Sequence, residues 1–288
     1  MGLITPFDPW RSKLCSCPVK YSLSAYTGCG HGCLYCYASS YIPSFFAPRP
    51  KKNFLERLRR ELKKLKTRTY ITMANSSDPY LPIEKKLKLT RASLRIMKDY
   101  TLRIMLVTKS DLITRDLDIL QEIKKIVVSF TITTLDETIA RKLEPAAPSP
   151  RARLEAIRTL AKKLPVAVRL DPLIYPLNTA DKDIKNTIKI LKEAGAKQII
   201  TSSYKAKPDN LKRMIRGFPE YKKLWHKLYL IEGEKKGWYI YLPQNIRKNL
   251  ILSVREEVLK NKLIFSSCRE EMAQFNTGVC DGSLLFET

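Results

Sequence analysis

The sequence predicts an α/β fold built on parallel strands, and two observations support this fold class. Apolar residues recur alternately with a period of two and a period of 3.6, which is typical of strands that alternate with helices. Six strand-like runs occur in succession, which predicts parallel strands joined by right-handed crossovers. The pattern alone allows either an open sheet or a barrel.

The elements follow in order along the chain. The predicted strands cover 20–26, 69–74, 102–108, 126–132, 165–170 and 197–201. The predicted helices cover 52–66, 115–124, 151–163 and 181–194, the last of which stops before a C-capping Gly195. Later elements are a hairpin within 225–242, which turns at 234–237, and a helix over 244–260. The predicted parts are an N-terminal extension (1–20), the βα array (21–205) and a basic, aromatic C-terminal region (206–288).

The net charge indicates a polyanionic partner. The 288 residues include 53 Lys and Arg against 28 Asp and Glu, which gives +25. Such an excess is typical of proteins that bind nucleic acid, the alternative being a generally basic surface. There is no apolar run of about eighteen residues, and residues 1–20 lack a signal-peptide pattern, so we expect a cytoplasmic protein without a membrane span. In that compartment, seven cysteines indicate metal or redox chemistry.

Three of the cysteines lie on one glycine-rich loop after the first predicted strand. Cys29, Cys33 and Cys36 have the spacing C-x3-C-x2-C, and the glycines among them disfavour a helix. Three thiolates can hold a cubane iron–sulfur cluster and leave its fourth iron open to another ligand. The alternatives are a zinc site that uses Cys33 and Cys36 with another cysteine pair, or an electron-transfer cluster with a fourth thiolate.

This loop, with Tyr35 as the aromatic residue before its last cysteine, resembles that of the radical SAM superfamily. The resemblance implies a partial (β/α)6 barrel with a C-terminal extension. It also implies a [4Fe–4S] cluster that reductively cleaves S-adenosylmethionine (SAM) to a 5′-deoxyadenosyl radical, with an electron donor such as ferredoxin or flavodoxin.

Five ordered motifs narrow the resemblance. KYSLSAYTGCGHGCLYCYA, SSDPYLPIEKKLKLTR, VTKSDLITRDLDIL, SFTITTLDE and LEPAAPSPRARLEAI resemble the spore photoproduct lyase-related, DNA repair photolyase-like branch over about residues 17 to 200. With the positive charge, this implies modification or repair of a nucleic-acid base, in DNA or RNA. The alternatives are a radical SAM enzyme acting on a protein or peptide, and a non-enzymatic iron–sulfur protein that binds nucleic acid. Asn75 departs from the lyase pattern, which has a hydrogen-donating cysteine at that position.

The resemblance implies SAM contacts at the carboxyl ends of the strands, where barrel enzymes gather their sites. The expected set is Tyr35, Ser76, Ser77, Asp78, Lys109, Ser129, Thr131 and Arg169. Lys109 is expected at the SAM carboxylate, unless it is a surface lysine. The three residues that end the second strand are expected at the amino group, and Ser129 and Thr131 at the ribose.

Several of these residues have structural alternatives. Asp78 precedes Pro79 and can instead stabilise a turn. Arg169 can form a strand-end salt bridge with Asp171. Glu144 and Arg153 flank a proline-rich loop and are expected to form a structural ion pair.

The four remaining cysteines and three aromatic residues complete the candidate set. Cys15, Cys17, Cys268 and Cys280 lie in loop-like sequence and are expected to share an auxiliary site, either a second iron–sulfur cluster or zinc, unless they are inert reduced thiols. Three aromatic residues of the C-terminal region are expected either to stack on a nucleic-acid base or to pack within a hairpin: Trp225, Trp238 and Tyr241.

Overall fold

A single eight-stranded sheet organises the chain in the computed structural model, which describes residues 2–7 and 14–287. Its order is β1-β2-β5-β6-β7-β8-β9-β12. The strands are β1 (Thr5–Pro6), β2 (Tyr21–Leu23), β5 (Tyr70–Met73), β6 (Arg103–Thr108), β7 (Ile126–Thr131), β8 (Val166–Leu173), β9 (Gln198–Ser203) and β12 (Ile264–Ser267). Neighbours from β2 to β12 are parallel, whereas β1 is antiparallel to β2. The predicted α/β fold is confirmed, and the sheet is consistent with a partial barrel.

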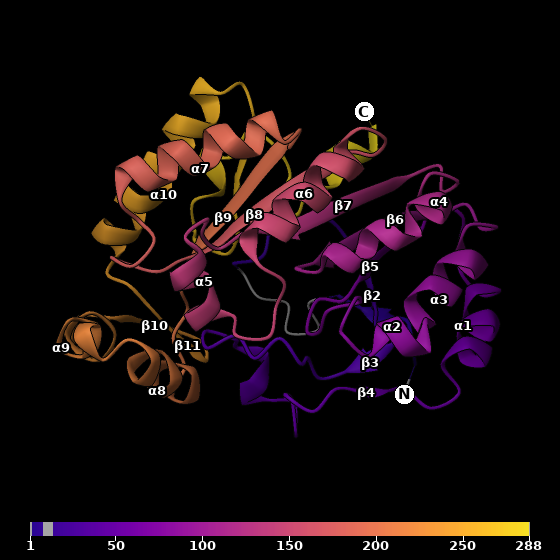
Figure 1. The fold of residues 1–288 in the computed structure, drawn as a ribbon, viewed down its shortest axis with the longest axis horizontal. Coiled ribbons are helices and arrows are strands. Elements are labelled where there is room, and N and C mark those ends of the chain that lie inside the picture. Colours follow the sequence, from indigo (N-terminus) through magenta and orange to yellow (C-terminus); the bar gives the residue numbers. More distant parts are fainter. Residues whose placement is uncertain (1, 8–13, 288) are drawn as a thin grey trace.

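Helices cover one face of this sheet, and Figure 1 shows several of them in an arc along it. The helices in the described ranges are α1 (Phe54–Leu62), α2 (Glu84–Leu87), α3 (Leu89–Met97), α4 (Leu117–Leu120), α5 (Glu137–Leu143), α6 (Pro150–Ala161), α7 (Asp181–Glu193), α8 (Pro208–Gly217), α9 (Lys222–Trp225) and α10 (Gln244–Lys260). Of these, α8 and α9 pack in a separate apolar cluster. Two small sheets pair β3 (Tyr26–Thr27) with β4 (Arg49–Pro50), and β10 (Glu234–Lys236) with β11 (Tyr239–Tyr241). No helix in the described ranges has the length and apolar character needed to cross a membrane.

The C-terminal segment covers part of the other face of the sheet. Because successive side chains of a strand point to opposite faces, Ile71, Ile104 and Val128 pack toward the helices while their neighbours face inward. The inward-facing residues form a separate cluster with the chain's last residues: Tyr70, Met105, Val127, Ala167, Ile200, Leu285 and Phe286. The C-terminal segment therefore fills the interior beside the amino-terminal ends of the strands.

The predicted hairpin is correct only in its second half. Residues 222–231 form α9 and a π-helical turn (His226–Ile231), because Trp225 is buried among aromatic rings and donates its Nε1 hydrogen to the carbonyl of Tyr175 at 2.7 Å. The predicted turn at 234–237 is also misplaced, since β10 occupies 234–236 and the chain turns at Gly237 and Trp238. The sequence analysis did not anticipate α2, α3, α5, α8 or β12.

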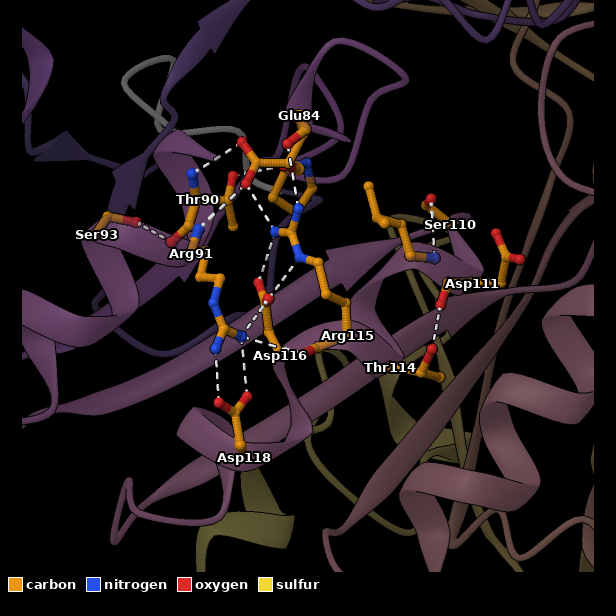
Figure 2. A network of polar contacts seen from close by, with 12 residues as sticks. Glu84, Thr90, Arg91, Ser93, Ser110, Asp111, Thr114, Arg115, Asp116 and Asp118 are labelled. Carbon is orange, nitrogen blue, oxygen red and sulfur yellow. Dashed lines mark hydrogen bonds and ion pairs between the residues drawn. The ribbon is translucent and has the colours of Figure 1, made fainter. Parts of the chain in front are cut away.

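A buried network of charges joins the loops after β5 and β6, as Figure 2 shows. Glu84, which has no exposed surface, accepts a hydrogen bond from Arg115 at 2.9 Å. Arg91 pairs with buried Asp116 at 2.8 Å and with Asp118 at 2.6 Å. These residues come from two of the sequence motifs, and their contacts give those motifs a structural role in holding the strand-end loops.

Candidate active site

The three-cysteine loop has a backbone that only glycine permits at its start. Gly28 has φ of +81°, and a Cβ there would lie 2.4 Å from the carbonyl oxygen of Phe45. That same carbonyl accepts a hydrogen bond from the amide of Cys29 at 2.7 Å, and the amide of Leu34 donates to Leu143 at 2.8 Å. The loop is therefore fixed at both ends against neighbouring segments.

The three thiols lie within electrostatic reach of one another. Burial raises the pKa of each thiol, that of Cys33 to about 12. Neighbouring sulfurs raise the pKa values of Cys29 and Cys33 further, whereas Lys109 opposes the rise at Cys33 and Cys36. Three thiols with this spacing are the kind of donor set that a cubane cluster with one open iron uses, although the described residues do not gather them into a ready metal-binding group. Burial disfavours a free thiolate, and ligation to iron would stabilise that charged form.

His31, a loop residue that the sequence analysis did not single out, connects the loop to the strand ends. Its Nε2 lies 3.2 Å from Oδ2 of Asp78, and both side chains are nearly inaccessible. Asp78 also accepts hydrogen bonds from Thr108 Oγ1 and from the amides of Tyr80 and Lys109, each at 2.8 Å. Although burial raises the pKa of Asp78, His31 and the amides of Lys109 and Tyr80 lower it overall. Both carboxylate oxygens of Asp78 therefore already accept hydrogen bonds from the protein, and the one from the amide of Tyr80 is the contact that the turn alternative predicts.

A second buried carboxylate supports the other side of the loop. Glu144 forms the expected ion pair with Arg153 at 2.5 Å and accepts hydrogen bonds from Thr133 at 2.8 Å and from Tyr35. Burial would raise the pKa of Glu144, but the charges of Arg153 and Lys109 and the hydrogen bond from Tyr35 lower it to about 2. The carboxylate thus fixes the aromatic ring that precedes Cys36.

Strand-end residues meet at a cavity of about 290 Å³. Six of the eight predicted SAM residues line it: Tyr35, Ser77, Asp78, Lys109, Thr131 and Arg169. Ser77 donates a hydrogen bond to the carbonyl of Gly28 at 2.5 Å, so it also holds the loop. Two predicted residues are outside the lining, because Ser76 contacts Tyr41 at 3.3 Å and Ser129 is fully buried. None of the three loop cysteines is among the described residues that line the cavity, although their loop neighbours Tyr35 and Tyr37 are.

The ammonium of Lys109 lines the cavity and has hydrogen-bond donors left for a ligand. Its Nζ lies 4.0 Å from Glu144 and 5.7 Å from the centre of the Tyr35 ring, and it donates no hydrogen bond to any described residue. Burial lowers its pKa, but Cys33 and Glu144 raise it overall, so the ammonium stays charged. Arg169 instead forms the alternative salt bridge with Asp171, at 2.8 Å.

The other four cysteines do not form the expected single group. Cys17 and Cys280 bring their sulfurs within 3.2 Å of each other, and Cys15 is hydrogen-bonded to Cys17. Cys268 lines the cavity elsewhere and is hydrogen-bonded to Arg169. Residues 2–7 and 14–287 contain no group of three or more His, Cys, Asp and Glu side chains placed to hold a metal ion. An auxiliary metal site is therefore not supported, and the expected cluster at Cys29, Cys33 and Cys36 rests on their spacing rather than on a preformed metal site.

An aromatic and basic group lies at the opening of the cavity. Tyr239 lines the cavity and packs edge-on against Tyr37, with ring centres 6.0 Å apart. The Nζ of Lys207 lies 4.9 Å from the centre of the Tyr239 ring and 5.5 Å from that of Tyr41. Of the three aromatic residues considered for base stacking, Trp238 is 85% exposed at the β10–β11 turn, whereas Trp225 and Tyr241 are buried.

Comparisons with known proteins agree with this arrangement. The family model of the radical SAM superfamily matches residues 23–191. The uncharacterized protein MJ0683 of Methanocaldococcus jannaschii is 33% identical over 147 residues, which cover 49% of this chain and 55% of that relative's length. The chain therefore spans about half of that curated relative.

Two solved structures share the fold. A spore photoproduct lyase mutant with bound AdoMet and dinucleoside spore photoproduct has a TM-score of 0.67 at 18% identity, over 91% of this chain and 79% of that one. SuiB of Streptococcus suis, bound to its precursor peptide SuiA, has a TM-score of 0.58 at 13% identity, over 85% of this chain and 48% of that one.

Proposed function

The chain belongs to the radical SAM superfamily and is an enzyme, and we propose that it cleaves SAM reductively to modify or repair a nucleic-acid base. The observation that carries the first part is the position of Lys109. Its charged ammonium donates no hydrogen bond within the described residues, lines the cavity and lowers the pKa values of the Cys33 and Cys36 thiols against the effect of burial. That arrangement suits a ligand that carries a carboxylate and also binds an open iron.

The residues of this chain would divide the work as follows. Cys29, Cys33 and Cys36 would hold the [4Fe–4S] cluster, which when bound supplies the electron that cleaves SAM to a 5′-deoxyadenosyl radical. Lys109 would bind the SAM carboxylate by a charge-assisted hydrogen bond. Asp78 and Glu144 would act as positioning residues, because each is saturated by contacts that fix the loop.

Nucleic acid is the substrate class that the surface favours. The net charge is +25, and the cavity opening combines tyrosine rings with Lys207 and an exposed Trp238 nearby along β11. Aromatic rings beside cations suit a base that is extruded and stacked, with its phosphates neutralised. Spore photoproduct lyase, which shares the fold, was solved with a dinucleoside lesion. Because Asn75 lines the cavity and an amide is a poor hydrogen-atom donor, we do not propose that lyase's own repair route.

The first test is chemical. We expect the anaerobically reconstituted chain to form 5′-deoxyadenosine from SAM and dithionite even without substrate, as an uncoupled side reaction. The Cys29→Ala/Cys33→Ala/Cys36→Ala variant should form none. Reconstituted protein that holds iron yet leaves SAM intact would contradict the proposed chemistry.

The second test addresses the substrate. Binding of labelled single-stranded DNA and RNA, measured by fluorescence anisotropy, should weaken steeply with salt because phosphate contacts release counterions. Trp238→Ala should weaken it about tenfold, since stacking on one base contributes roughly 1–3 kcal/mol. Ile231→Ala, which is also an exposed apolar residue, should leave it unchanged. Salt-independent or undetectable binding would instead favour a peptide substrate, as SuiB has.

A further inference from the structure

Two cysteines from opposite ends of the chain meet in the cavity wall. Cys17 precedes β2 and Cys280 lies in the C-terminal segment, 263 positions later, yet their sulfurs are 3.2 Å apart. Both are free thiols and both line the cavity. Their role is not covered by the SAM site, which uses the loop cysteines.

The residues around this thiol pair hold it in place. Lys20 and Asp281 form a buried ion pair at 2.5 Å, and Tyr70 donates a hydrogen bond to Asp281 at 2.9 Å. Asp281 follows Cys280 directly, and Lys20 lies three residues after Cys17, so the ion pair fixes both cysteine-bearing segments. Burial lowers the pKa of Lys20, but the charges of Cys17 and Asp281 raise it overall, so a cation stays beside the sulfurs.

We propose that Cys17 and Cys280 are a reversible dithiol–disulfide site, independent of the SAM chemistry. Disulfide sulfurs are about 2.05 Å apart, so the pair needs to approach by only about 1 Å. The oxidant is a small-molecule disulfide. The thiolate of one cysteine attacks it and releases one thiol, and the second cysteine then displaces the other thiol from the mixed disulfide. In sum, two protein thiols and one disulfide yield one protein disulfide and two small thiols.

Formation of this bond would have a direct effect on the fold. The C-terminal segment packs against the inner face of the sheet through Leu285 and Phe286. A covalent bond to Cys17 would tie this segment to the residues before β2 and close a loop of nearly the whole chain. It would also remove two S–H groups from the cavity wall. Oxidation of the pair would thus stabilise the packing of the C-terminal segment against the sheet.

The test uses the full chain with Cys29, Cys33 and Cys36 replaced by alanine, so that its outcome does not depend on the cluster. The protein is equilibrated anaerobically with oxidised and reduced glutathione, alkylated, and digested with trypsin. Cleavage at the basic residues places Cys17 in the peptide 14–20, Cys280 in 270–288 and Cys268 in 263–269. We expect a crosslink between 14–20 and 270–288 that is two hydrogen atoms lighter than the sum of the free peptides and disappears with dithiothreitol.

Matched variants make the outcome specific. Cys280→Ser should abolish the crosslink, whereas Cys15→Ser and Cys268→Ser should retain it. The oxidised protein should unfold at a higher temperature than the reduced protein, and Cys280→Ser should remove that difference. A disulfide inside 14–20, between Cys15 and Cys17, or a persistent glutathione adduct without the crosslink, would overturn the proposal.

Discussion

The chain holds two cysteine groups, and they are built in opposite ways. Cys29, Cys33 and Cys36 come from eight consecutive residues, on a loop that glycines shape and two buried carboxylates support. Cys17 and Cys280 come from the two ends of the chain and meet only because the C-terminal segment folds against the sheet. A local group has a spacing that can be read from sequence, whereas a group assembled by the fold does not. The contrast also separates the loop proposed to bind the cluster from a thiol pair.

Iron content should distinguish the two cysteine groups completely, because only the loop cysteines are expected to bind iron. After anaerobic reconstitution we expect about four irons per chain, as one cubane cluster requires, and none in the Cys29→Ala/Cys33→Ala/Cys36→Ala variant. Cys17→Ala/Cys280→Ala should retain all four. The measurement is iron and acid-labile sulfide per chain. About eight irons in the wild type, falling to about four in Cys17→Ala/Cys280→Ala, would indicate an auxiliary cluster at these cysteines. That result would contradict the distinction between the two groups.

Both groups should depend on a buried ion pair for support. Glu144→Gln leaves Arg153 buried without its counter-ion, and breaking such a pair costs about 3–5 kcal/mol in the free energy of unfolding. Asp281→Asn, which leaves Lys20 unpaired at the end group, should cost a similar amount. Glu155→Gln is the control, because its pair with Arg158 is exposed and should contribute less than about 1 kcal/mol. Urea denaturation of the metal-free proteins measures all three, and equal stabilities would refute the argument.

These contacts also mark how far the sequence could predict the site. The six predicted strands were placed correctly because buried parallel strands leave strong apolar runs. The role of the three loop cysteines was predicted from their spacing and stays a prediction. The Glu144 and Arg153 pair was expected, since both flank one loop. By contrast, Asp78 binds His31, and Cys17 binds Cys280, through contacts that depend on how separate segments pack. Only the first half of the predicted hairpin was wrong, because burial of Trp225 favoured a helix there.

Lys109 allows a test with a smaller expected effect, specific to the proposed SAM site beside the three-cysteine loop. Lys109→Met keeps the length of the side chain but removes the proposed partner of the SAM carboxylate. Losing one charge-assisted hydrogen bond costs roughly 1.5–3 kcal/mol, so SAM affinity should fall about 10- to 100-fold. Lys207→Met, a lysine at the cavity opening, should leave SAM affinity unchanged and weaken only nucleic-acid binding. Equilibrium dialysis with labelled SAM distinguishes the two, and equal losses would mean that Lys109 has no special role.

Acid should produce the smallest effect, and its sign follows from the carboxylates. The pKa of Glu144 in the folded state is about 2, below its ordinary value of 4.5. The unfolded chain therefore takes up the proton first. The stability that Glu144 contributes is complete above about pH 4.5 and is lost as the pH falls toward 2. Between pH 7 and pH 4 the loss is on the order of 1 kcal/mol.

The variants turn this pH dependence into a test of the comparison. The stability gap between the wild type and Glu144→Gln should narrow on acidification, because the glutamine cannot titrate. Asp281→Asn should behave in the same direction, since Lys20 lowers the pKa of Asp281 against the opposing effect of burial. Urea titrations at pH 7, 5 and 4 measure both gaps. A gap that stays constant for Glu144→Gln but narrows for Asp281→Asn would show that only the pair of Cys17 and Cys280 depends on a charged carboxylate, which would contradict the similar support argued from the two ion pairs.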